Sequence, residues 1–286
     1  MKKVLVINGP NLNLLGEREP RIYGSETLAE LNEALAVYCQ KMNMDMRSFQ
    51  SNHEGEIIDV MHANRKWANG IVLNPGALTH YSYALRDAIA SVNLPTIEVH
   101  LSDIMKREEF RKHSVVEDVC AERFIGLGRD GYFRAVEFLA GLGVLKKLKE
   151  FMASGKDKDA VLKKTVRLLK ESFPKYTWVG IYLKDGEELV LHNFIGKPTP
   201  HERIPVGNGI CGAAASEKQS IIVDDVDADS RYLACSVETR SEIVVPIMSE
   251  VDVFGEIDID SDHKAIFHEG DRKMLEECSR LLLDVF

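Results

Sequence analysis

The sequence predicts two consecutive domains that both combine helices with a β-sheet but differ in how their strands are connected. The chain has 286 residues, enough for two domains of ordinary size. In roughly the first 143 residues, short apolar strands alternate with helical segments, which is typical of a parallel sheet covered on both faces. In the second half, strands follow one another through short turns, which indicates an antiparallel sheet. The predicted fold class is therefore α/β, a flavodoxin-like doubly wound parallel five-stranded sheet, followed by an α+β domain with an antiparallel sheet.

The alternation in the first half is read from apolar periodicity. The segment KKVLVIN at 2–8 is a short apolar run that ends in Gly9-Pro10, as a buried strand followed by a turn would. From Thr27 to Met42, apolar residues recur at helical spacing. The same patterns predict strands at 2–8, 46–50, 70–74, 96–99 and 119–127, and helices at 27–42, 56–67, 81–91 and 132–148.

The two halves are expected to meet in the segment 141–159, which begins as a helix and ends in Ser, Gly and mixed charge. We therefore expect a first domain at 1–148, a linker at 149–159 and a second domain at 160–286. The second domain is predicted to contain helices at 160–172 and 270–284, with strands near 177–183, 188–194, 220–223, 242–248 and 253–259.

Composition excludes several classes of protein. The formal net charge is −9, and neither half is basic, so nucleic acid is not expected as a partner. No apolar run is long enough to span a bilayer, and the apolar start is too short for a signal peptide, so a cytoplasmic location without membrane contact is expected. The five cysteines form no C-x-x-C pair, and their odd number argues against a disulfide framework.

In the first half, polar residues gather where the predicted strands end. In a doubly wound sheet, ligands bind beyond the carboxyl ends of the strands. Asn11 follows the first strand, the segment 74–80 follows the third, and the segment 98–102 covers the end of the fourth. Singly, each residue has an ordinary explanation, such as a turn-forming Asn or a solvated helix face for Arg107 and Arg111. Their coincidence at one edge indicates a site for a polar ligand that carries a carboxylate.

A glycine pattern at 126–131 offers a rival interpretation, a nucleotide- or flavin-binding module. The residues GLGRDG fit G-x-G-x-x-G between a strand and a helix. A dinucleotide site requires this motif in the first strand–helix turn, with an acidic residue about 20 positions later. Here the motif lies in the last such unit of the domain, so no nucleotide cofactor is expected.

The first half resembles the type II 3-dehydroquinate dehydratases. The resemblance covers nearly all of residues 1–143 and keeps the order and spacing of the family's motifs. The segments that carry it are 7–24, QSNHEGEIID at 50–59, LNPGALTHYSYALRDA at 73–88, IEVHLSD at 97–103, REEFRKHS at 107–114 and GLGRDGY at 126–132. The resemblance implies conversion of 3-dehydroquinate to 3-dehydroshikimate, a step of the shikimate pathway to aromatic amino acids, without metal or cofactor. It also implies a homo-oligomer, a dodecamer built from trimers.

The resemblance assigns catalytic roles residue by residue. Tyr23 takes the place of the family's base, and His100 takes that of its acid. Arg18 corresponds to the arginine that activates the base, Asn11 to the amide on the enolate side, and Glu98 to the partner of the acid. The resemblance also implies binding residues, among which Asp87 reaches a neighbouring subunit's site. The residues implied to bind substrate are Asn74, His80, Asp87, Leu101, Ser102 and Arg111.

These residue types suit the elimination of water from a β-hydroxy ketone. A tyrosinate can remove the proton beside the carbonyl, and arginine charge favours the anion of a phenol that otherwise titrates near 10. The enolate needs hydrogen-bond donors, and a histidine can protonate the departing hydroxyl. Glu98 and His100 are two apart on a strand, so both side chains point to the same face and can interact.

The second half has fewer signals. Glu256, Asp258 and Asp260 alternate along one predicted strand and so share a face. Three carboxylates on one face are ordinarily a solvent-facing side, although they would also suit an ammonium group. Trp178 and Tyr182 are ordinarily core residues. Cys211 lies in a glycine-rich turn at a predicted helix start, where a thiolate would be stabilised.

The second half resembles the GAF domains and, among them, the free methionine-(R)-sulfoxide reductases. The segments that carry the resemblance are TWVGIYL at 177–183, RIPVGNGICGAAA at 203–215, YLACSVETRSEIVVPI at 232–247 and GEIDIDS at 255–261. It implies that Cys235 is the attacking cysteine and Cys211 the second one. It also implies that the sulfoxide pocket is lined by Trp178, Tyr182, Glu242, Asp258 and Asp260.

One position departs from the reductase pattern, and two interpretations of this half stay open. His201 stands where the family often has a third cysteine, so Cys211 or an external thiol reductant such as thioredoxin would have to resolve Cys235. The second half is either a working methionine sulfoxide reductase, which makes the chain bifunctional, or a non-catalytic module for small-molecule sensing or assembly.

Overall fold

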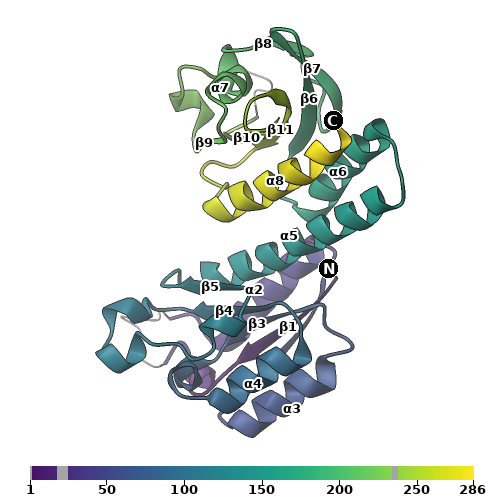
Figure 1. Cartoon of the computed structure of the whole chain (residues 1–286). Helices are drawn as coiled ribbons and strands as arrows, with labels where there is room; N and C mark the ends of the chain where they lie inside the picture. The colour runs from purple at the N-terminus through teal and green to yellow at the C-terminus, as the bar shows by residue number, and fades with distance from the viewer. Residues whose placement is uncertain (1, 18–24, 234–237) are drawn as a thin grey trace. The chain divides into compact units, whose positions relative to one another are not determined.

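The structure is a computed structural model that describes residues 2–17, 25–233 and 238–286. The chain divides into two compact units, residues 1–140 and 141–286, which are drawn in Figure 1. Both predicted fold classes are confirmed. Within the described part of the chain, no helix combines the length and the apolar character that crossing a bilayer requires.

The first unit is built on a parallel five-stranded sheet in the order β2-β1-β3-β4-β5. This is the flavodoxin-like order, in which the chain reverses direction across the sheet between β1 and β3. All four pairings are parallel, so the carboxyl ends of β1, β3 and β4 lie at the same edge. The strands are β1 (Lys3–Asn8), β2 (Asp45–Gln50), β3 (Gly70–Asn74), β4 (Thr96–His100) and β5 (Glu122–Ile125).

Helices cover both faces of this sheet. In Figure 1, α3 (Glu54–Asn64) and α4 (Tyr83–Val92) lie on one face, and α2 (Leu28–Lys41) and the first part of α5 (Asp130–Ala153) lie on the other. On the α3–α4 face, apolar side chains of both helices pack against Leu5 and Ile7 of β1. Short 3-10 helices complete the unit at Leu12–Leu14, Gly76–His80, Ile104–Lys106, Glu109–Arg111 and Glu117–Val119.

Two elements differ from the predicted ranges. The fifth strand spans only Glu122–Ile125 of the predicted range 119–127, because a 3-10 turn at Glu117–Val119 takes up the first predicted residue. The last helix continues to Ala153, and the next helix begins at Lys158 with Asp157 as its N-cap. Only residues 154–157 between them are not helical, so most of the segment that we expected to be an irregular linker is helix.

The second unit contains a six-stranded antiparallel sheet in the order β8-β7-β6-β11-β10-β9. In Figure 1, α7 (Gly209–Glu217) covers one face, while α6 (Lys158–Ser172) and α8 (Glu269–Leu282) cover the other. The sequence did not predict β8, which has only three residues. The strands are β6 (Trp178–Asp185), β7 (Glu188–Ile195), β8 (Arg203–Pro205), β9 (Ile221–Val223), β10 (Ser241–Met248) and β11 (Val253–Ser261), with 3-10 turns at Val226–Ala228 and Leu283–Val285.

Candidate functional site

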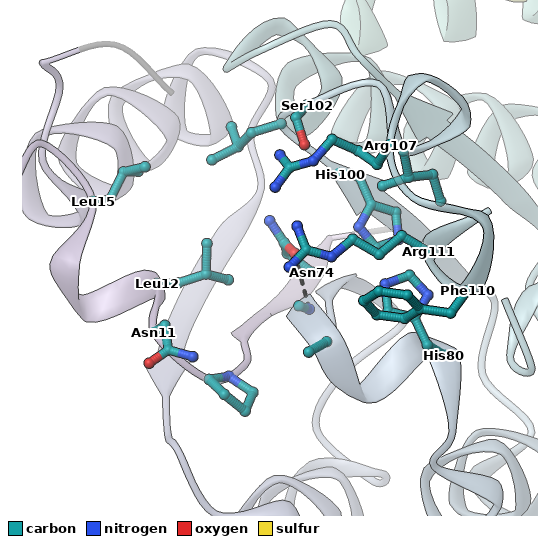
Figure 2. A pocket seen from close by; sticks show the side chains of 15 residues that line it. Asn11, Leu12, Leu15, Asn74, His80, His100, Ser102, Arg107, Phe110 and Arg111 are labelled. Atoms are coloured by element: carbon teal, nitrogen blue, oxygen red, sulfur yellow. Dashed lines mark hydrogen bonds between the residues drawn. The ribbon is translucent and has the colours of Figure 1, made fainter. Parts of the chain in front are cut away.

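A pocket opens at the carboxyl edge of the parallel sheet, where the turns after β1, β3 and β4 meet (Figure 2). Its volume is about 300 Å³. Among the described residues, no lysine and no acidic residue lines it, whereas two arginines and two histidines do. The lining residues are Pro10, Asn11, Leu12, Leu15, Asn74, Gly76, Ala77, His80, His100, Leu101, Ser102, Ile104, Arg107, Phe110 and Arg111.

The turns after β1 and β3 approach closely enough to require glycine. A Cβ atom on Gly9 would lie 2.5 Å from the carbonyl oxygen of Pro75, a distance that real Cβ atoms do not show. The Gly9 amide donates a hydrogen bond of 2.8 Å to the Asn74 carbonyl. Beyond it, Asn11 adopts the left-handed conformation with φ 68°, and its amide donates to Asn52 Oδ1 at 2.8 Å. These contacts bring Asn11 and Asn74 to the same pocket.

The interaction between Glu98 and His100 is buried under the pocket. His100 Nε2 lies 2.7 Å from Glu98 Oε1, and the two residues are 5% and 0% exposed. Thr79 and Ser114 donate further hydrogen bonds to the same carboxylate. Burial raises the pKa of Glu98, but the hydrogen bond and charge of His100, with the two hydroxyl donors, outweigh it and hold the pKa below its ordinary value. The ionised carboxylate therefore orients the imidazole and leaves Nδ1 of His100 for a ligand.

His80 is oriented by the backbone. Its Nδ1 lies 2.8 Å from the carbonyl oxygen of His113. A carbonyl only accepts hydrogen bonds, so Nδ1 carries a proton and Nε2 is left for a ligand. The ring of Phe110 meets the imidazole edge-on at a centroid distance of 6.0 Å, which fixes its plane.

Arg107 and Arg111 give the pocket positive charge. Their Nε atoms lie 3.8 and 3.5 Å from one oxygen of Glu108, which does not line the pocket. In Figure 2, both side chains extend toward Asn74. Because arginine recognises carboxylates through paired hydrogen bonds, this pocket suits an anionic ligand.

A second cluster lies on the face of the antiparallel sheet that α7 covers. Strand register places Glu242 opposite Asp260, and Glu256 opposite Tyr182. The expectation that the β11 carboxylates face solvent is wrong, because α7 and its neighbouring loops cover them. The buried members, all at most 4% exposed, are Tyr182, Cys211, Glu242, Glu256, Asp258 and Asp260.

These carboxylates are short of hydrogen-bond donors. Among the described residues, both oxygens of Glu256 and one oxygen each of Asp258 and Asp260 have no hydrogen-bond partner. Burial raises the pKa values of Glu242, Glu256 and Asp260 well above their ordinary range, and the charge of Asp258 adds to this effect. Burial raises the pKa of Asp258 itself to about 7. A cationic group would therefore be stabilised in this cluster.

The thiol of Cys211 belongs to the same cluster. Its Sγ lies 3.8 Å from Glu242 Oε1. The expectation that the helix start stabilises a thiolate is wrong here. Burial, followed by the negative charges of Asp258, Glu256 and Glu242, raises the pKa of Cys211 well above its ordinary value. The proximity of three carboxylates outweighs the helix N-terminus.

Two aromatic side chains border the acidic cluster and are fixed by backbone carbonyls. Trp178 Nε1 donates to the carbonyl of Lys197 at 3.0 Å, and Tyr182 Oη donates to that of His201 at 2.9 Å. A Cβ atom on Gly180 would lie 2.1 Å from the Trp178 ring, and one on Gly196 would lie 2.3 Å from it. The indole therefore lies directly against the backbones of two glycines, and a side chain added at either position would displace it.

Comparison with known proteins gives a match for each unit. Residues 2–140 match the class II dehydroquinase family, and residues 157–282 match the GAF domain family. The 3-dehydroquinate dehydratase of Bacillus pumilus (strain SAFR-032) is 52% identical over 143 residues, which are 50% of this chain and 97% of the relative. The chain belongs to the class II dehydroquinase family. The second unit adds a GAF domain to it.

Solved structures that resemble the GAF unit come from two kinds of protein. A putative GAF sensor protein from Burkholderia vietnamiensis is 32% identical, with a TM-score of 0.50 over 52% of this chain and 94% of that one. A type II free methionine-R-sulfoxide reductase from Thermoplasma acidophilum is 38% identical, with a TM-score of 0.44 over 48% of this chain and 94% of that one.

Apart from Glu98, which is buried beneath the pocket, the predicted site residues of the dehydroquinase unit fall into three groups. Leu101 and Ser102 line the pocket together with the two asparagines, His80, His100 and Arg111. Asp87 lies exposed on α4 and does not line the pocket of its own chain. Arg18 and Tyr23 lie outside the described residues, and so does Cys235 of the GAF unit.

Sequence reasoning missed Tyr132, which holds Asn74 in place. The Tyr132 hydroxyl accepts a hydrogen bond from Asn74 Nδ2 at 2.9 Å and donates one to Asn8 Oδ1 at 2.6 Å. The Gly76 amide donates to Asn74 Oδ1 at 3.2 Å. Together these contacts determine which way the Asn74 amide faces. The available signal was a tyrosine in the first turn of a helix packed against the ends of two buried strands.

We expect Tyr132→Phe to destabilise the dehydroquinase unit, because it leaves Asn8 Oδ1 and Asn74 Nδ2 without their buried partner. A loss of this kind costs about 1–3 kcal/mol. Amide hydrogen exchange in β1 and β3 of the full-length protein measures it. Tyr38→Phe is the matched control, because its hydroxyl bonds to the half-buried Glu137, which water can reach. Equal effects of the two substitutions would contradict the assignment.

Proposed function

We propose that the dehydroquinase unit converts 3-dehydroquinate to 3-dehydroshikimate, a step of the shikimate pathway to aromatic amino acids. The observation that carries this proposal is the buried Glu98–His100 interaction at the floor of a pocket whose described lining includes two arginines and no acid. The strong similarity to 3-dehydroquinate dehydratases supports it. The reaction uses no metal or cofactor in this proposal, and the part of the pocket that the structure describes contains no lysine to form a Schiff base.

Elimination begins with removal of a proton beside the substrate's carbonyl. We assign this step to the phenolate of Tyr23, with Arg18 stabilising the anion. Both residues lie outside the described part of the chain, so the assignment rests on family resemblance. The electron pair of the broken C–H bond forms an enolate, whose charge Asn11 stabilises as a donor or through a water molecule.

The enolate then expels the β-hydroxyl group. His100 protonates the departing oxygen from Nδ1, so that water leaves, while Glu98 stabilises the ring through Nε2. Tyr23 gains one proton and His100 loses one during the reaction. Proton exchange with solvent then returns both residues to their starting states. The residues proposed to bind the substrate's carboxylate and hydroxyl groups are Asn74, His80, Leu101, Ser102 and Arg111.

Tyr23→Phe should abolish dehydratase turnover while substrate still binds, because only the proton-removing group is lost. A general base contributes roughly 100- to 10,000-fold to the rate. Steady-state kinetics measure kcat, and isothermal titration calorimetry measures binding of 3-dehydroquinate. Tyr38→Phe, a tyrosine on the outer helix α2, serves as the control and should keep full activity. A Tyr23→Phe protein with more than about a tenth of the wild-type rate contradicts the role of the base.

For the GAF unit, we propose reduction of free methionine-(R)-sulfoxide. The buried carboxylates, which lack hydrogen-bond donors in the described residues, suit the substrate's ammonium group, and Trp178 and Tyr182 suit its apolar part. The thiol of Cys235 attacks the sulfoxide sulfur and takes over the oxygen as a sulfenic acid, which releases methionine. Cys211 or an external thiol then attacks this sulfur, which expels water and forms a disulfide, and a dithiol reductant such as thioredoxin supplies the two electrons.

The second candidate function for this unit is a non-catalytic one, ligand sensing or assembly. The high pKa of Cys211 favours it, because a thiol attacks a sulfenic acid poorly when it stays protonated. His201, in place of a third cysteine, favours it as well. Under this alternative, the same carboxylates bind the cationic group of a ligand, and no reaction follows.

Full-length protein given free methionine-(R)-sulfoxide and a thioredoxin system should release methionine, and Cys235→Ser should abolish this turnover. Amino-acid analysis quantifies the product. Cys120→Ser, in the other unit, is the control and should keep the wild-type rate. Binding of the sulfoxide by calorimetry without any turnover would favour the sensing alternative.

We propose that the protein is a cytoplasmic homo-oligomer, a dodecamer held by the dehydroquinase units with the GAF units on its exterior. Asp87 is exposed on α4, and Tyr83, one helical turn earlier on the same face, is 69% exposed. The exposed aromatic side chain suits contact with a neighbouring subunit, because aromatic residues are enriched at protein interfaces. The proposed domain boundaries remain 1–148 and 160–286, with 149–159 between them.

Light scattering should give a twelve-subunit mass both for the whole chain and for a truncation ending at Ala153, where α5 ends. The reason is that the assembling surfaces all lie in the dehydroquinase unit. Asp87→Ala should lower the dehydratase rate clearly while lowering the free energy of unfolding only slightly. If the truncated protein is a monomer while the full-length protein is a dimer, the GAF unit drives assembly and this prediction is wrong.

A further inference from the structure

We infer that Cys211, Glu242 and Asp258 of the GAF unit form a binding site for Zn²⁺, in the same cluster that we propose to bind methionine sulfoxide. One ligand atom from each residue, the Cys211 sulfur and one oxygen from each carboxylate, lies within 4.8 Å of the other two. All three residues are at most 4% exposed. They come from α7, β10 and β11, so the sheet and its covering helix bring them together from distant parts of the sequence.

The separation of these atoms is close to that of a zinc site. Zinc binds thiolate sulfur at about 2.3 Å and carboxylate oxygen at about 2.0–2.2 Å, which places the two atoms about 3.6 Å apart in a tetrahedral site. The Cys211 sulfur and Glu242 Oε1 are 3.8 Å apart. A bound ion therefore requires little movement of this pair, and the third atom, at most 4.8 Å away, needs a side-chain shift of about 1 Å to reach the same spacing.

The surroundings of the three residues lack the groups that would otherwise compensate buried acids. Within the described residues, no ion pair joins Glu242, Glu256 or Asp258 to a basic side chain, and Asp258 Oδ1 and both Glu256 oxygens accept no hydrogen bond. Buried carboxylates without donors are costly unless they coordinate a cation. Glu256 precedes Asp258 by two residues on the same face of β11, so its free oxygens can supply a fourth ligand or hold a zinc-bound water.

The donor set selects among cations. Magnesium and calcium prefer oxygen ligands only, and an ammonium group would bind the carboxylates but would not use the sulfur. One thiolate and two carboxylates in tetrahedral reach suit Zn²⁺. A thiolate bound to zinc is not available to resolve a disulfide, so Zn²⁺ and methionine sulfoxide would exclude each other from this cluster.

The test is titration of the full-length protein, freed of metal by a chelator and then dialysed, with ZnCl₂ and separately with CoCl₂. Calorimetry should give one Zn²⁺ per chain, and Co²⁺ should produce the ligand-to-metal charge-transfer absorption of a cobalt–thiolate bond. Cys211→Ser should remove that absorption, and Asp258→Asn should weaken Zn²⁺ binding at least about tenfold. Asp262→Asn is the matched control, because it alters an exposed acid four residues after Asp258 and should leave binding unchanged.

Three results would overturn the inference. The first is wild-type protein that binds no Zn²⁺, and the second is Co²⁺ binding without thiolate absorption, which needs no variant to fold. The third is Zn²⁺ binding that Cys211→Ser and Asp258→Asn leave unchanged, which would place the ion elsewhere. None of these measurements depends on turnover of methionine sulfoxide, so a GAF unit without reductase activity can still bind the ion.

Discussion

The carboxylate of Glu98 connects three segments on which the pocket of the dehydroquinase unit depends. It accepts hydrogen bonds from Thr79 in the turn after β3 and from Ser114 in the loop beyond the arginines, and it contacts His100 at the end of β4. These donors keep a fully buried acid ionised. A charge held in this way orients the imidazole and, through the same oxygens, fixes the two loops that carry His80 and Arg111.

The two units contain buried carboxylates in opposite electrostatic situations. Around Glu98, side-chain donors compensate the loss of water, and its pKa falls. Among the described residues, both oxygens of Glu256 and one oxygen of Asp260 lack such donors, and the pKa values of the two carboxyl groups rise. The first arrangement is complete without a ligand. The second is incomplete until a cation or a proton enters, which is the property expected of a binding site rather than of a scaffold.

The sequence allowed prediction of those features that depend on local pattern. The strand 70–74 was predicted to the residue, because a run of buried residues lies between Asn69 and Pro75. The helix predicted at 27–42 matches α2, which Thr27 and Glu30 cap in a reciprocal pair. The alternation of strands and helices gave the fold class of each half, and the polar strand ends gave the position of the pocket.

What the sequence left out depends on contacts between distant segments. Tyr132 is fixed by Asn8 and Asn74, which lie 124 and 58 residues away along the chain. The β11 carboxylates alternate as a solvent-facing strand would, and only the position of α7 shows that they are buried. For Cys211, the local helix start predicted one charge state, whereas burial, together with three carboxylates from two strands, produces the opposite one.

The glycines beside Trp178 bear on how this unit can change during evolution. The indole packs against the backbone of Gly180 and Gly196. Its position is therefore set by residues that have no side chain with which to contact a ligand. A single methyl group at either position would push the ring away and reshape the aromatic wall, and one at position 180 would also stand beside Asp258, its partner on β11. Substitution at position 196 would therefore alter the shape of the aromatic wall separately from the charge of the acidic cluster, which gives this framework a route to new small-molecule preferences.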